Sequence, residues 1–131
     1  MNIVVDTSVI IAVLLNEPIK ASLIEATLSA TLCAPASLHW EIGNALSAMF
    51  KQKRLSLDDA QKVLRIYKQI PLNLVDVDLG KSVQVSSDHG VYAYDAYFIV
   101  CAHKLHAPLL SLDKGLKLAA IQAGIKLMEV I

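Results

Sequence analysis

Short runs of β-branched residues alternate along this chain with longer stretches of helical periodicity, and this alternation restricts the fold more than any other feature. Strands that are separated by helices in this way form a parallel sheet with helices packed on its faces. The pattern predicts strands at residues 3–5, 31–34, 73–77, 109–112 and 126–130. We therefore expect an α/β fold, a three-layer α/β/α sandwich on a parallel sheet of four to five strands.

Apolar residues recur at helical spacing between these strands. The spacing predicts helices at residues 8–15, 18–28, 38–53, 57–69, 79–87, 93–105 and 114–123. Ser37 and Ser56 stand where helix N-caps are expected. The chain has no internal repeat, no low-complexity tract and no long linker, so we expect residues 1–131 to form one domain.

Charge and cysteine content indicate how such a domain meets RNA and which cellular compartment suits it. The 131 residues include 12 basic and 12 acidic side chains, a formal net charge of zero, so RNA is not attracted by a global positive field. Both cysteines, Cys33 and Cys101, lie in apolar stretches, which favours buried thiols in a reducing compartment over a disulfide. We expect a cytoplasmic protein.

The longest apolar run also argues against a membrane protein. It extends over residues 9–15, and seven residues are far fewer than the roughly 20 that a spanning helix needs. No basic residue precedes the run, and Asp6 stands just before it, so the start of the sequence does not read as a secretory signal.

Four acidic residues are placed to meet at one edge of the predicted sheet. Asp6 directly follows the first strand and Asp113 follows the fourth, and ligands of open parallel sheets bind beyond these carboxyl ends. Asp95 shares a helix side with Phe98 and Ile99, which should face the core. Glu41 lies inside its helix, beside a border of small residues. Carboxylates buried together repel one another, and a bound divalent cation reverses that penalty.

Capping is the simpler explanation for three of these acids taken singly. Asp6, Asp95 and Asp113 all lie near predicted helix starts, where aspartate is favoured. Glu41 has no such explanation, and one shared site accounts for all four acids together. Carboxylate oxygens select Mg²⁺ or Mn²⁺.

The ordered motifs of the chain resemble those of PIN domains, most closely those of VapC toxins from toxin–antitoxin pairs. The likeness lies in VVDTSVII (residues 4–11), the segment around Glu41, YDAY (94–97) and LSLDK (110–114), and it covers essentially the whole chain. It implies an endoribonuclease with Mg²⁺ or Mn²⁺ as its cofactor, bound by Asp6, Glu41, Asp95 and Asp113. Ser8 matches the small hydroxyl residue that supports the site in this family.

The same resemblance implies partners. A VapC-like toxin forms a homodimer and receives the C-terminal segment of an antitoxin in a groove, for which the helices at 8–15, 18–28 and 38–53 are our candidates. The RNA substrate must find local contacts with basic and aromatic side chains. The basic candidates are Lys51, Lys53 and Arg54 at the end of one helix, and Lys114 next to Asp113. Three tyrosines near Asp95 are candidates for stacking on bases, namely Tyr92, Tyr94 and Tyr97.

Other functions fit the residues less well. A haloacid-dehalogenase-type phosphatase needs a second aspartate two residues after Asp6, where this chain has Ser8. A receiver domain needs an acidic neighbour for Asp6, which is absent. Two readings stay open, a PIN-domain nuclease of general RNA processing and a PIN-like binding module without catalysis. The histidines supply neither a triad base nor a credible zinc site, because His103 and His106 have no third ligand nearby.

Overall fold

A computed structural model describes residues 1–130 and has four parallel strands in the order β3-β2-β1-β4. The strands are β1 (Asn2–Val5), β2 (Thr31–Pro35), β3 (Leu72–Val75) and β4 (Leu109–Leu110). The helices are α1 (Thr7–Leu14), α2 (Lys20–Ala26), α3 (Ser37–Lys51), α4 (Leu57–Tyr67), α5 (Leu79–His89), α6 (Ala93–Leu105) and α7 (Lys114–Gln122). The predicted α/β fold with a parallel sheet is thus confirmed.

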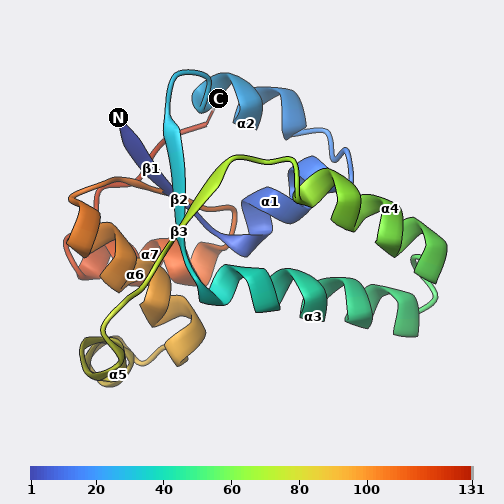
Figure 1. Ribbon diagram of the computed structural model, residues 1–131. Helices are drawn as coiled ribbons and strands as arrows, with labels where there is room; N and C mark the ends of the chain where they lie inside the picture. The colour runs from blue at the N-terminus through green and yellow to red at the C-terminus, as the bar shows by residue number, and fades with distance from the viewer. Residues whose placement is uncertain (131) are drawn as a thin grey trace.

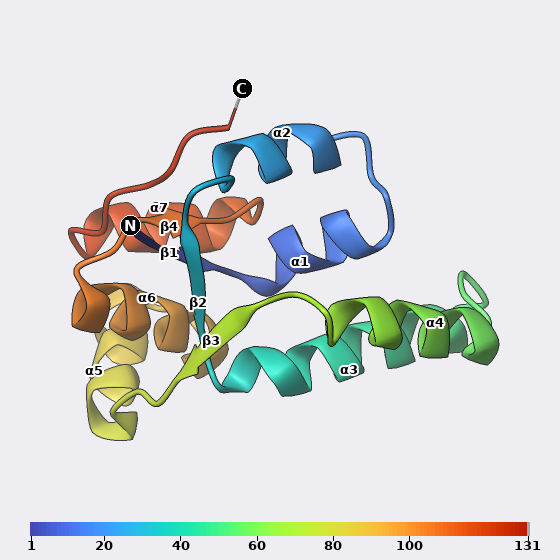
Figure 2. The ribbon, with the colours of Figure 1, turned by 45° about the horizontal axis from the view of Figure 1, so that its top comes forward.

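Helices cover both faces of the sheet. Figure 1 shows α5, α6 and α7 on one side of the strands, and α1 and α2 on the other. The helices α3 and α4 form an antiparallel pair that extends beyond the sheet, as Figure 2 shows most clearly. Within residues 1–130, every helix is too short or too polar to span a bilayer.

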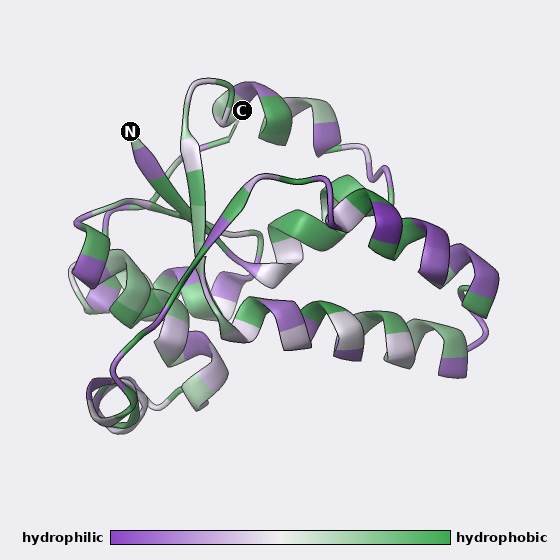
Figure 3. Cartoon of the chain, in the orientation of Figure 1, coloured by the Kyte–Doolittle hydropathy of each residue, from purple (hydrophilic) through white to green (hydrophobic). Residues whose placement is uncertain are grey.

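The core forms around β1, the central strand between β2 and β4. Ile3, Val4 and Val5 are each at most 1% exposed, as expected for a strand that is covered on both faces. Most of α1 is apolar (Figure 3), and five of its eight residues are buried. On the opposite face Phe98, Ile99 and Cys101 of α6 are buried too, and Cys33 and Cys101 are free thiols, as predicted.

The predicted fifth strand at residues 126–130 is wrong. Only one bridge forms, in which Leu109 N donates to Lys126 O at 2.9 Å and Met128 N donates to Leu109 O at 2.8 Å. The reason lies in β4, which has two residues instead of the predicted four. From Ser111 onward the chain turns toward Asp6, so the fourth strand offers no longer edge for pairing.

Two helix starts were predicted with different success. The Ser56 hydroxyl accepts a hydrogen bond from Asp59 N at 3.0 Å, so Ser56 is the N-cap of α4 as expected. Ser37, in contrast, is the first helical residue of α3, and the cap is Ala36, which makes no side-chain capping bond. The Ser37 hydroxyl is instead buried next to Glu41.

Candidate functional site

Asp6 is the buried centre of the candidate site. It follows β1 directly, is the N-cap of α1, and is 4% exposed. Its Oδ1 accepts hydrogen bonds from Ser8 Oγ at 2.6 Å and from Val9 N at 3.2 Å, and its Oδ2 accepts one from Ser111 Oγ at 2.7 Å. Because each carboxylate oxygen has two lone pairs, Oδ2 keeps one free to meet a cation.

The two serines fix the loops around Asp6. Ser8 Oγ also accepts a bond from Leu112 N at 2.9 Å, and Ser111 Oγ accepts one from Asp113 N at 3.0 Å. The loop after β4 is therefore joined to the start of α1 through side chains more than 100 residues apart in sequence. Ser8, which the sequence singles out only as a hydroxyl residue supporting the site, bonds the Asp6 carboxylate directly. Ser111 was not predicted, and its only signal in the sequence is its position two residues before Asp113.

Asp113 caps α7. Its Oδ1 accepts hydrogen bonds from Gly115 N at 2.9 Å and from Leu116 N at 3.2 Å. Its Oδ2 takes part in neither bond. The capping interpretation of Asp113 is thus correct as far as it goes, and it leaves one carboxylate oxygen free for a second role.

Glu41 lies in the middle of α3 with its carboxylate turned inward. Its Oε2 is buried and has no hydrogen-bond partner within residues 1–130, and the buried hydroxyls of Thr7 and Ser37 also lack a partner of good geometry. Thr7, and to a smaller extent Ser37, nevertheless lie close enough to lower the pKa of Glu41. Burial, followed by the charges of Asp6 and Asp95, outweighs them and raises its pKa from 4.5 to about 7.

Asp95 stands in the first turn of α6 without capping it, because the N-cap is Tyr92. Its carboxylate is half-buried, and its pKa is raised mainly by burial and then by the charges of Asp113 and Asp6. The pKa of Asp6 is raised as well, because burial outweighs its hydrogen bonds, and Asp113 adds to the rise. All four acids therefore belong to one electrostatic neighbourhood.

The carboxylate oxygens of this site are the kind of ligand that a divalent cation prefers, but the distances between the described side chains are too long for direct binding. The site offers carboxylate oxygens, one of them buried without a partner, and mutual repulsion that a cation would relieve. Among residues 1–130, however, no three acidic, histidine or cysteine side chains already stand at metal-binding distance. Side-chain rotations would have to bring the oxygens closer around the ion.

The raised pKa of Glu41 leads to a stability prediction. Below about pH 4.5 Glu41 is protonated in both folded and unfolded chains, and between pH 4.5 and about 7 the folded protein holds this proton more tightly. In chelator, wild type should therefore lose stability relative to Glu41→Gln as the pH rises through this window. The full shift corresponds to roughly 3 kcal/mol, and partial exposure reduces our expectation to about 1 kcal/mol.

Urea denaturation at pH 5 and pH 8 measures this difference. Glu25→Gln, an exposed glutamate of α2, is the matched control and should follow wild type at both pH values. Parallel stability profiles for wild type and Glu41→Gln would show that Glu41 titrates normally.

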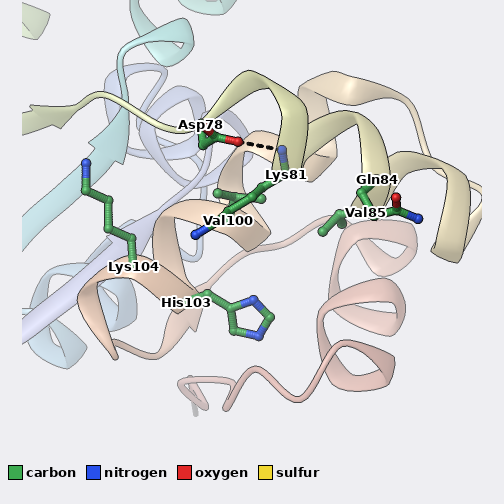
Figure 4. Close-up of a pocket in the computed structure, with 7 residues that line it drawn as sticks. All are labelled: Asp78, Lys81, Gln84, Val85, Val100, His103 and Lys104. Atoms are coloured by element: carbon green, nitrogen blue, oxygen red, sulfur yellow. Dashed lines mark hydrogen bonds between the residues drawn. The ribbon is translucent and has the colours of Figure 1, made fainter.

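Two hollows of the surface need to be distinguished, one beside Glu41 and one that contains none of the four acids. One adjoins the acids and is lined by Thr7, Trp40, Glu41, Asn44, Ala45 and Tyr94. A larger one, about 500 Å³, lies between α5 and α6 and contains none of the four acids (Figure 4). Its polar groups serve the fold: Lys104 Nζ donates to Asp76 O at 2.6 Å, and Asp78 caps α5 by accepting from Lys81 N at 2.7 Å.

Comparison with known proteins places the chain in a family. The model of the PIN domain matches residues 3–122. No curated protein sequence matches significantly. VapBC2 from Rickettsia felis, solved with a promoter DNA fragment, is similar in structure with a TM-score of 0.69 and 15% identity over 100% of both chains.

Two further solved structures have the same fold. FitAcB from Neisseria gonorrhoeae has a TM-score of 0.66 and 16% identity, over 97% of this chain and 96% of that one. VapC20 from Mycobacterium tuberculosis, a sarcin–ricin loop cleaving toxin, has a TM-score of 0.61 and 14% identity, over 89% and 94%. At these identities the likeness shows the fold alone. Because the family model spans nearly the whole chain, this protein belongs to the PIN domain family.

Proposed function

We propose that this chain is a metal-dependent endoribonuclease that hydrolyses RNA phosphodiester bonds. The observation that carries the proposal is the meeting of four carboxylates from different parts of the chain, each close enough to another to raise a pKa. A fold needs no such repelling group for its stability. The electrostatic cost of placing these carboxylates together is explained if a cation binds among them.

In this proposal Asp6, Glu41, Asp95 and Asp113 hold Mg²⁺ or Mn²⁺, with Asp6 and Asp95 as the tightest ligands. The cation would supply a nucleophile at neutral pH and relieve charge on the phosphate oxygens. Ser8 and Ser111 keep the Asp6 carboxylate in one orientation through their hydrogen bonds, which is how neighbouring groups tune a ligand. We do not assign Ser8 as a nucleophile, because its hydroxyl is engaged by Asp6 Oδ1 and Leu112 N.

RNA cleavage in the presence and absence of metal tests this function. Purified protein should cut single-stranded or looped RNA with Mg²⁺ or Mn²⁺, and excess chelator should reduce the rate to background. Renewed cleavage on adding back Mn²⁺ would exclude damage by the chelator. Cleavage that continues undiminished in chelator would contradict the proposal.

We further propose that the enzyme is the toxin of a toxin–antitoxin pair. An apolar hollow of about 200 Å³ lies against α1 and α2, with Val9, Val13, Leu23 and Ile24 in its lining. Ile24 is 44% exposed and Leu28 at the end of this region is 70% exposed, which is costly unless a partner covers them. VapC20, a solved structure of the same fold, is a toxin, and an apolar segment of an antitoxin suits this surface.

A homodimer is the second partner that we propose, because the small domain leaves further apolar side chains in solvent, among them Leu118 and Ile121 of α7. Sedimentation at micromolar concentration would detect it. A small adjacent gene encoding an antitoxin would favour the toxin role over general RNA processing.

A further inference from the structure

Two large aromatic side chains stand in solvent and line a hollow beside Glu41. Trp40 on α3 is 75% exposed and Tyr94 on α6 is 63% exposed. They come from helices that are far apart in sequence, and they line the same hollow, which has a volume of about 340 Å³. Leaving large rings in water forfeits the stabilisation that their burial would give, and two such rings lining one hollow offer faces on which a planar ligand can stack.

The hollow is continuous with the acids. Glu41 and Thr7 line it together with the two aromatic rings, and Glu41 is the acid whose Oε2 is buried without a partner. Tyr94 directly precedes Asp95, and Trp40 directly precedes Glu41. Any molecule in the hollow therefore lies next to Glu41, one of the four proposed metal ligands.

Both rings are held in position by neighbours. Trp40 meets His39 edge to face, with ring centres 4.9 Å apart, and Tyr94 meets Tyr97 in the same manner at 6.2 Å. Asn44 lies one helical turn beyond Trp40 and lines the hollow with an amide that offers both donors and an acceptor. Aromatic faces with one such amide are the groups that recognise a nucleobase.

We propose that this hollow binds one unpaired nucleobase of the RNA substrate, stacked on Trp40 or Tyr94 with its polar edge toward Asn44. The inference rests on the proposed ribonuclease function and adds the part of the substrate that the enzyme reads. An unpaired base is required, because bases inside a duplex have no free face for stacking. A base held here lies beside Glu41, which lines the hollow.

Trp40 is the only tryptophan of the chain, so its fluorescence reports on the hollow directly. The binding test uses the Asp6→Asn variant with Mg²⁺, to avoid cleavage, and titrates it with single-stranded ten-nucleotide RNAs of A, C, G or U. At least one of them should quench the fluorescence. Tyr94→Ala in the same background should weaken that binding about 5-fold or more, the loss expected for one stacked base.

Kinetics with the otherwise wild-type enzyme give a second readout. Trp40→Ala should raise KM about 5-fold or more with a smaller change in kcat, and Trp40→Phe should restore part of the loss. Phe50→Ala, an exposed aromatic near the other end of α3, is the matched control and should leave KM unchanged. The rise in melting temperature with Mn²⁺ should be the same in Trp40→Ala as in wild type, because no proposed metal ligand is altered.

The ribonuclease proposal and the base-site proposal are contradicted by different results. A wild-type enzyme that cuts no RNA contradicts the nuclease, whereas the fluorescence titration still decides the base site. Unquenched fluorescence with all four RNAs, or equal affinity in Tyr94→Ala, overturns the base site. Quenching by an arginine-containing peptide and by no RNA overturns it too, and would indicate a protein partner at this hollow.

Discussion

Asp6→Asn and Asp95→Asn should each reduce RNA cleavage at least about 100-fold. Each change removes one negative charge and keeps the size of the side chain. Asparagine at position 6 retains an oxygen that can cap α1 and accept from Ser8, so the loss would report on charge and not on the fold. Initial rates with Mg²⁺ and with Mn²⁺ measure the effect.

Asp76→Asn is the matched control, because Asp76 is exposed on the loop after β3 and lines neither hollow near the acids. It should cut RNA at the wild-type rate. Circular dichroism and a cooperative melting curve would verify that all three variants are folded. If folded Asp6→Asn and Asp95→Asn both cut as fast as Asp76→Asn, the assignment of the site is wrong.

Mg²⁺ or Mn²⁺ should also raise the melting temperature of the wild-type protein by roughly 10 °C when the free metal is about 100 times its Kd. The reason is linkage: a cation that binds only the folded acids stabilises the fold, because it offsets the burial and then the repulsion that raise the pKa values of Glu41 and Asp95. Without metal, Asp6→Asn should have a higher melting temperature than wild type when the relief of repulsion outweighs the altered hydrogen bonds of residue 6. With metal, the increase in its melting temperature should be smaller than that of wild type.

Differential scanning fluorimetry with each cation measures these shifts. Asp76→Asn again serves as the control and should gain as much as wild type. An equal gain in wild type and in single Asn or Gln variants of all four acids would place the cation elsewhere on the protein.

The arrangement of the strands and helices could be predicted because each is encoded locally. Helix α6 has the predicted bounds, since its apolar periodicity begins after Tyr92 and ends before His106. The buried run Ile3 to Val5 predicts a central strand, and the carboxyl-end rule of parallel sheets then places Asp6 and Asp113 at one edge. Topology, which follows from local pattern, brings the elements that carry the four acids near enough for their charges to affect one another.

What could not be predicted depends on contacts between distant residues. Ser111 bonds a residue 105 positions earlier, directly after β4 ends, and residues 126–130 meet the short β4 in a single bridge. The hollow beside the acids needs Trp40 and Tyr94 together, and neither position alone indicates it. In the sequence, helix capping and metal binding are alternative explanations of Asp113. In the structure the two roles are compatible, because Asp113 caps α7 with one carboxylate oxygen and keeps the other free.

A crystal soaked with Mn²⁺ tests the central claim most directly, because anomalous scattering locates the ion without reference to activity. We predict an anomalous peak coordinated by Asp6 and Asp95, with Glu41 and Asp113 bound directly or through water, and no such peak in Asp6→Asn soaked at the same concentration. A fully occupied Mn²⁺ site away from these four carboxylates, or no ion at a concentration that supports RNA cleavage, would contradict the account.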